Sequence, residues 1–451
     1  MSNEVQPPAP AAARRPRPSR RQFLTIAGCG ALGAAGASLV APRMVDRLIA
    51  AESTTQNYGP TAGGRTRGSG GADPGLVLVS VQLSGGVDFL NAVVPLNDPR
   101  YGQVRSAGTL DVDRADTPLT RIDDAYALHA MPYLGERWAA GELAIVHGVG
   151  WEGSSLSHFD ATDMWEKGSP DFGTRTGWIG RALGDLAGAE PDPLLGLSMG
   201  GISPTMYADG WSPVGLEPGR RIPWSAAFVD EYAALDAALR EQPVAAGSDL
   251  VALARNSQLD LRGLGARLGP IVEGRGERND EFTEEGDDVE DTDGGYLDTQ
   301  LSLVADLING GIPTRAFHVS LDGFDTHANQ AADLPRLLGE VDAGIRRFHH
   351  RLGPAAERVV VATWTEFGRR PDWNGDGTEH GTAGVQFVVG PRVSGGHHGE
   401  PPPLDRFDAD DNFIVTTDFR DYVAGLTLGA VGADPAVVGS GLRGPLELIE
   451  A

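Results

Sequence analysis

The fold follows from a short apolar run, Arg358-Val-Val-Val-Ala-Thr-Trp364, and from the polar residues directly after it, Thr365-Glu-Phe-Gly-Arg-Arg370. The run is typical of a strand that is buried on both faces, as in a parallel sheet covered by helices. Ligands of open α/β sheets bind beyond the carboxyl ends of the strands. The pattern therefore places a carboxylate and two arginines at a ligand-binding edge. A second polar motif follows closely, Gly377-Thr-Glu-His-Gly-Thr-Ala383.

The same kind of run recurs along the chain from about residue 75. Buried-strand patterns also cover residues 76–83, 143–149, 315–321 and 385–390. Helical patterns lie between or after them, at about 157–167, 178–186, 226–238, 296–309, 331–352 and 417–430. This alternation predicts an α/β fold with a doubly wound, mainly parallel sheet covered by helices. We expect a single domain over residues 75–451.

Residues 1–50 have the features of an export signal. The segment Ser19-Arg-Arg-Gln-Phe-Leu24 matches the twin-arginine motif, further arginines precede it, and an apolar run rich in Gly and Ala continues to Ala41. We predict export by the twin-arginine pathway to an extracytoplasmic location, with no stable membrane span after processing. That location is the periplasm, the cell wall or the medium. Lipidation at Cys29 is disfavoured because only a few apolar residues precede that cysteine.

Two segments are predicted to be solvated chain. Residues 51–74 are rich in Ser, Thr, Gly and Pro, which indicates a flexible linker. Residues 272–295 are dense in acidic residues and too poor in apolar ones to offset the entropy of ordering, which indicates a disordered insertion. Weak calcium binding is the alternative for this insertion. Asp372-Trp-Asn-Gly-Asp-Gly-Thr378 also resembles half of a calcium loop. Ala383 at the twelfth position excludes an EF-hand, and a looser calcium loop is the alternative for this segment.

Composition narrows the classes of partner. The formal net charge of −25 argues against binding to nucleic acid or to anionic lipid. Cys29 is the only cysteine and lies in the predicted signal, so no disulfide is expected after processing. Lys167 is the only lysine, so a positive site must be built from arginine or metal.

Two loops beyond predicted strands pair small residues with polar ones. After strand 76–83, two glycines precede Asp88 and let the backbone approach a ligand. The alternative role for Asp88 is to cap the next turn. After strand 143–149, Ser157 opens a helix, where a hydroxyl lies beside free N–H groups that favour anions. A capping pair of Ser157 with Asp160 is the alternative there, and His158 is expected to orient a substrate or to pack.

Two further loops carry carboxylates and histidines. After strand 315–321, Asp325 and His327 lie two residues apart and can converge on one ion. The motifs after strand 358–364 add Glu366, Arg369, Glu379 and His380. Carboxylate oxygen and imidazole nitrogen are the ordinary ligands of zinc and manganese. The sequence therefore predicts a divalent metal site at this edge, holding zinc, manganese or calcium.

In this order the motifs resemble the DUF1501 family of exported bacterial proteins. That family is similar to the alkaline phosphatase–sulfatase superfamily, which would make the fold alkaline-phosphatase-like. The resemblance covers about residues 76–450. The matching segments are Gly85-Gly-Val-Asp-Phe-Leu-Asn91, Ser157-His-Phe159, Gly323-Phe-Asp-Thr-His327, Glu366-Phe-Gly-Arg369, Gly377-Thr-Glu-His-Gly-Thr-Ala383 and Thr417-Asp-Phe-Arg-Asp-Tyr422.

The resemblance implies roles for particular residues. The implied metal ligands are Asp88, Asp325, His327, Glu366 and His380, with Glu379 nearby. Ser157 is the implied nucleophile, and Arg369 or Arg370 would clamp substrate oxygens. Phe367 stands where the superfamily has a ligand histidine, which indicates one metal rather than two, or a metal-free remnant. An alternative alignment gives Glu379-His-Gly381 that role.

Two functions remain open from the sequence. The first is an exported metal-dependent hydrolase of phosphate or sulfate esters, acting on a small molecule or an envelope polymer. The second is a non-catalytic extracytoplasmic protein on the same fold, binding a partner or an envelope polymer. The sequence identifies no particular protein partner.

Overall fold

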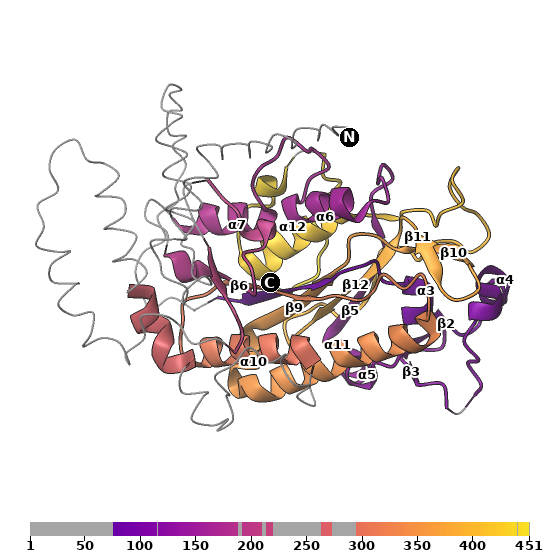
Figure 1. Cartoon of the computed structure of the whole chain (residues 1–451), viewed down its shortest axis with the longest axis horizontal. Helices are drawn as coiled ribbons and strands as arrows, with labels where there is room; N and C mark the ends of the chain where they lie inside the picture. Colours follow the sequence, from indigo (N-terminus) through magenta and orange to yellow (C-terminus); the bar gives the residue numbers. More distant parts are fainter. Residues whose placement is uncertain are drawn as a thin grey trace, which may run out of the picture.

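A computed structural model describes residues 75–114, 116–187, 192–209, 213–219, 263–272, 295–439 and 441–450. The predicted twin-arginine signal with Cys29, the linker, the helix at 226–238 and nearly all of the acidic insertion lie outside these residues. Figure 1 shows a central sheet between two layers of helices. Within the described part of the chain, no helix combines the length and the apolar character that crossing a bilayer requires.

The central sheet has nine strands among the described residues, and it is mostly parallel. Its order is β13-β5-β12-β9-β1-β8-β6-β7, and β14 pairs with β5. The bounds are β1 Val77–Leu83, β5 Leu143–Gly150, β6 Gly196–Met199, β7 Val214–Leu216, β8 Ala316–Leu321, β9 Val359–Trp364, β12 Gly384–Val389, β13 Gly396–His398 and β14 Thr417–Asp418. All five predicted strands are present. One of them, β12, runs antiparallel to both β5 and β9.

β1 lies at the centre of the sheet. It pairs in parallel with both neighbours, so that Leu78 lies opposite Ala316 of β8 and opposite Val360 of β9. Successive residues of a strand point to opposite faces. The valines of β1 accordingly join one hydrophobic core and Leu78 joins the other. This two-sided burial explains why the strand patterns are apolar throughout.

Helices cover both faces of the sheet. Figure 1 shows α6 (His158–Lys167), α7 (Trp178–Ala187) and α12 (Phe419–Leu426) on one face. The other face carries α5 (Pro132–Ala139), α10 (Gly295–Asn309) and α11 (Gln330–Leu352). The helices predicted at 157–167, 178–186, 296–309 and 331–352 are confirmed. The pattern at 417–430 instead divides into β14, α12 and a π-helical turn at Thr427–Val431.

The remaining elements of the described chain include a helix at residues 263–272 and several shorter ones. A three-stranded antiparallel sheet consists of β2 (Val93–Pro95), β4 (Tyr126–His129) and β3 (Leu119–Arg121). A hairpin consists of β10 (Arg369–Trp373) and β11 (Thr378–His380), with Arg369 opposite His380. The short helices are α3 (Phe89–Ala92) and α4 (Arg100–Arg105), with 3-10 turns at Ser106–Gly108, Pro193–Leu195, Pro204–Met206, Gly353–Arg358 and Pro435–Val438.

Candidate metal centre

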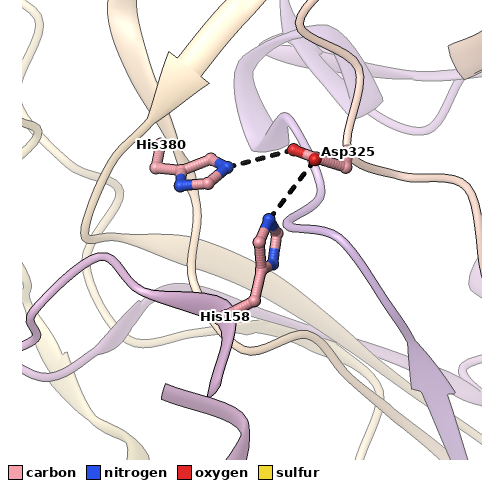
Figure 2. Close-up of side chains that lie close together, drawn as sticks. All are labelled: His158, Asp325 and His380. Atoms are coloured by element: carbon pink, nitrogen blue, oxygen red, sulfur yellow. Dashed lines mark hydrogen bonds and ion pairs between the residues drawn. The ribbon is translucent and has the colours of Figure 1, made fainter. Parts of the chain in front are cut away.

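Loops that follow β1, β5, β8 and β9 meet at one edge of the sheet. His158 comes from the start of α6 after β5, and Asp325 from the loop after β8. His380 ends β11, in the hairpin that follows β9. Figure 2 shows the three side chains turned toward one another. Carboxyl ends of parallel strands meet in this way in open α/β sheets, and one ligand atom from each of the three residues lies within 4.8 Å of the others.

The carboxylate of Asp325 is the centre of this group. Its Oδ1 is 3.0 Å from His380 Nε2, and its Oδ2 is 3.4 Å from His158 Nε2. His327 adds a third imidazole, whose Nε2 lies 3.0 Å from Asp325 Oδ1 and 2.9 Å from His380 Nε2. Ligands that share one ion at about 2.1 Å lie roughly 3–3.5 Å apart, so these separations fit a metal site.

Each of the three imidazoles is held at its other nitrogen by an acceptor. The Nδ1 pairs are His158 with Glu366 Oε1 at 2.7 Å, His327 with Glu379 Oε2 at 2.9 Å, and His380 with the Leu156 carbonyl at 2.9 Å. A carboxylate or a carbonyl can only accept, so each Nδ1 carries the proton. In the neutral ring the Nε2 lone pair is then free for a ligand. Metal-binding histidines are ordinarily oriented by this arrangement.

The pKa shifts of His380 and Asp325 also favour a metal site. Burial lowers the pKa of His380, which favours its neutral ring. Burial alone would raise the pKa of Asp325, but the hydrogen bond from Arg369, with smaller contributions from the histidines, lowers that pKa to about 2. The Nε2 of His158 is buried and makes no hydrogen bond. With the proton on each Nδ1, the Nε2 lone pairs face the Asp325 carboxylate, an arrangement that a divalent cation would stabilise.

Glu366 and Glu379 lie outside this ligand group and orient its histidines. Glu366 Oε1 accepts from the Gly85 amide at 2.8 Å as well as from His158. Phe367, in the place of the expected ligand histidine, is buried and packs its ring 4.5 Å from that of His380 and 4.9 Å from that of His158. Besides the predicted His327, the group includes His158, which the sequence had indicated only as a residue that orients substrate or packs.

Asp88 is separate from this group. Its fully buried carboxylate forms an ion pair with Arg105 and accepts from Gln330 Nε2 at 2.7 Å. It also caps α3 by accepting from the Leu90 amide at 3.2 Å. The structure shows the capping role that the sequence left open. The expected role as a metal ligand does not fit a carboxylate that is already neutralised by a buried arginine.

Arg369 is a buried residue that binds the carboxylate of Asp325. Its side chain is fully buried and donates to the carboxylate of Asp325 at 2.7 Å. Its remaining hydrogen bonds go to the carbonyls of Gly85, Gly86, Phe324 and Thr378. The expected role as a substrate clamp does not fit a fully buried guanidinium whose three nitrogens all donate to acceptors within the protein. Arg370 is the alternative, because its Nε donates to the His380 carbonyl at 3.2 Å and its terminal nitrogens have no partner among the described residues.

Ser157 occupies the predicted place at the start of α6. It is the N-cap residue in an extended conformation, and its hydroxyl makes no capping hydrogen bond. The alternative capping pair with Asp160 is not formed, since Ser155 Oγ donates to Asp160 Oδ2 at 2.9 Å. Leu156 has a left-handed backbone with φ of 56°, which is unusual for a branched side chain. That conformation accompanies the contact of its carbonyl with His380.

Comparison with known proteins confirms the family resemblance over part of the chain. Residues 236–423 match the model of the family described as "Protein of unknown function (DUF1501)". The fold and site define an α/β protein with a histidine-rich candidate metal centre. The matched stretch contains Asp325, His327 and His380, but not Asp88 or His158. Among curated proteins, no sequence matches the chain.

Several solved structures are similar to this chain at low identity and low TM-score. The protein called Ps i-CgsB has 8% identity and a TM-score of 0.37, over 82% of this chain and 75% of its own. The lipoteichoic acid synthase LtaP from Listeria monocytogenes has 8% identity and a TM-score of 0.32, over 82% and 74%. A mutant of TAB5 alkaline phosphatase with Mg bound has 10% identity and a TM-score of 0.27, over 72% and 94%. At such TM-scores these likenesses carry no conclusion about activity.

Proposed function

We propose that this protein is an exported metal-dependent hydrolase of phosphate or sulfate esters. The observation that carries the proposal is the convergence of three imidazole Nε2 atoms on the Asp325 carboxylate, with each Nδ1 held by an acceptor. Because calcium takes oxygen ligands and zinc takes nitrogen readily, zinc fits this set best, followed by manganese. A divalent ion held there supplies Lewis-acid polarisation of substrate oxygens.

The residues around the group supply the other parts of an ester hydrolase. Ser157 directly precedes His158, and its hydroxyl is free of capping contacts. Its position at the N-terminus of α6 puts it beside N–H groups and the positive end of the helix dipole, which stabilise an anion. We assign it the attack on phosphorus or sulfur: the bond from Oγ forms, the bond to the alcohol oxygen breaks, and the serine proton leaves with the alcohol. Water then hydrolyses the phosphoserine or sulfoserine ester, which releases phosphate or sulfate and restores the hydroxyl. Arg370 is assigned to binding of the ester oxygens, since an arginine fork matches such oxygens bidentately.

The test is a metal and substrate screen on the exported protein. Protein stripped with a chelator is reloaded with zinc or manganese, its metal content is measured, and phosphate monoesters, phosphate diesters and sulfate esters are assayed. We expect metal binding and hydrolysis of at least one ester class, with both lost in His158→Ala and both kept in His398→Ala, a histidine outside the group. Metal-loaded wild-type protein that is inert on every class would refute the hydrolase and leave the non-catalytic binding protein.

A further inference from the structure

A buried glutamine connects the two segments that carry the candidate ligands. Gln330 is the first residue of α11 and is almost fully buried. Its Oε1 accepts from Thr326 Oγ1 at 3.1 Å and from Thr378 Oγ1 at 2.6 Å. Thr326 lies between Asp325 and His327, and Thr378 lies two residues before His380 in β11. One amide oxygen therefore bridges the β8 loop and the β10–β11 hairpin.

The orientation of this amide is fixed. Its Nε2 donates to Asp88 Oδ2 at 2.7 Å, and a carboxylate can only accept. Rotation of the amide by 180° would place Oε1 against Asp88 and remove the acceptor from both threonines. Asp88 is itself held by the fully buried Arg105, which also donates to the carbonyl of Arg370 at 2.5 Å. The bridge is thus anchored on α3 and α4 as well as on α11.

The backbone joins the same two segments. The Thr378 amide donates to the Thr326 carbonyl at 3.2 Å, and the Gln330 amide donates to the Asp376 carbonyl at 3.1 Å. A Cβ on Gly377 would lie 2.1 Å from the Thr326 carbonyl oxygen, so glycine permits this approach. The side-chain bridge and these backbone contacts thus join the β8 loop to the β10–β11 hairpin directly beside the candidate ligands.

We propose that Gln330, anchored by Asp88, is a positioning residue that sets the spacing of Asp325 and His327 relative to His380. The proposal rests on the proposed metal site and gives Asp88 a role other than metal binding. Ligands must be held within about 0.5 Å of a productive geometry. Loss of an outer hydrogen bond to a metal site typically weakens metal affinity about 10–100-fold. The hydrogen bonds of Gln330 go to Thr326, Thr378, Asp88 and Asp376 and to none of the candidate ligands, so its effect on the metal is transmitted through the two threonines.

The test uses Co²⁺ as a spectroscopic probe of the full-length protein. Three variants remove the bridge, namely Gln330→Met, Thr326→Val and Thr378→Val. Two matched controls remove buried hydrogen bonds elsewhere. Gln300→Met breaks the contacts of a buried glutamine with Ser320, and Thr314→Val breaks that of a buried hydroxyl with the Leu194 carbonyl. Chelator competition gives the Co²⁺ dissociation constant, visible absorption reports its coordination, and thermal melts report folding.

We expect Gln330→Met, Thr326→Val and Thr378→Val each to bind Co²⁺ about 10–100-fold more weakly than wild type, with altered visible absorption. The controls should melt earlier and keep wild-type affinity and absorption. If Gln330→Met does not fold, the two threonine variants decide the question. Folded bridge variants with wild-type affinity and absorption would overturn the positioning role while leaving the metal site intact. Wild-type protein that binds neither Co²⁺ nor Zn²⁺ would instead overturn the proposed function, and this role with it.

Discussion

Arg369 shows how a single buried residue can hold several loops of the candidate site together. It is buried, and its guanidinium reaches acceptors in the loops after β1 and β8 and in β11. A lysine keeps the charge but offers one nitrogen with three donors in place of a planar fork. Buried carbonyl groups would then be left without partners, each at a cost of about 1–3 kcal/mol.

Arg369→Lys is therefore expected to lower the free energy of unfolding by roughly 2–4 kcal/mol and to weaken metal binding. Urea unfolding of metal-free protein and a metal titration measure the two effects. Arg100→Lys is the matched control, because Arg100 pairs with Asp98 and Asp405 at the surface, where ion pairs contribute about 1 kcal/mol or less. Equal stability of the two variants would contradict the role given to Arg369.

Glu166 is a residue whose environment gives stability a pH dependence. Burial, reinforced by the charge of Asp163, raises the pKa of Glu166 to about 7 from 4.5. A raised carboxyl pKa means that the folded state favours the protonated form. The resulting stability is present below pH 4.5 and is lost as the pH rises through about 7. Above that pH the folded protein carries an ionised carboxylate that its surroundings disfavour.

Glu166→Gln should consequently raise the melting temperature at pH 8 and change it little at pH 4.5. Melting curves at both pH values, on metal-free protein, measure the difference. Glu152→Gln replaces an exposed glutamate and serves as the control for removing one negative charge from a chain of net charge −25. A gain that is the same at both pH values would show that Glu166 does not titrate differently in the folded state.

At the scale of elements, a substitution at the start of α6 distinguishes a catalytic role for Ser157 from a capping role. A side-chain cap at a helix N-terminus typically contributes about 0.5–2 kcal/mol, but Ser157 makes no such bond. Ser157→Ala should therefore abolish ester hydrolysis while changing the melting temperature and the metal content very little. Ser169→Ala, beyond the other end of the same helix, should leave activity unchanged. A clear loss of stability with activity retained would assign Ser157 a capping role after all.

The sequence revealed some strands and not others. The patterns of β1, β5, β8, β9 and β12 were readable because each is an uninterrupted apolar run. The reversed direction of β12 was not readable, since a strand buried on both faces has the same pattern in either direction. The hairpin of β10 and β11 was missed because Arg-Arg-Pro-Asp-Trp shows no alternation of apolar and polar residues.

The site residues were readable through their place after strands, and their individual contacts were not. Asp325, His327 and His380 converge because the strands before them end at one edge. Asp88 has the same position in sequence relative to its strand, yet Arg105 from α4 neutralises it. Which carboxylate meets an arginine and which meets a histidine depends on side chains that are distant in sequence. No local pattern encodes that choice.

For the whole molecule, metal binding should raise the stability of the folded state and hence the melting temperature. A ligand that binds only the folded state stabilises it by RT ln(1 + [L]/Kd), which is about 2.7 kcal/mol at a hundredfold excess over Kd. Removing the metal with a chelator should lower the melting temperature, and returning zinc should restore it. In His158→Ala, which lacks a candidate ligand with a buried Nε2, neither step should shift the melt. A chelator-insensitive wild-type protein would argue against a resident metal.

Export concerns the chain as a whole, because the twin-arginine pathway carries proteins that are already folded. The motif Ser19-Arg-Arg-Gln-Phe-Leu24 is the basis of this expectation. Replacing Arg20 and Arg21 together by lysine should leave unprocessed precursor in the cytoplasm, detected by immunoblots of cell fractions. The same change at Arg14 and Arg15, outside the motif, should permit export. If folding and metal loading precede transport, the retained precursor should also resist proteolysis and contain metal. Normal export of the Arg20 and Arg21 variant would show that another pathway reads this signal.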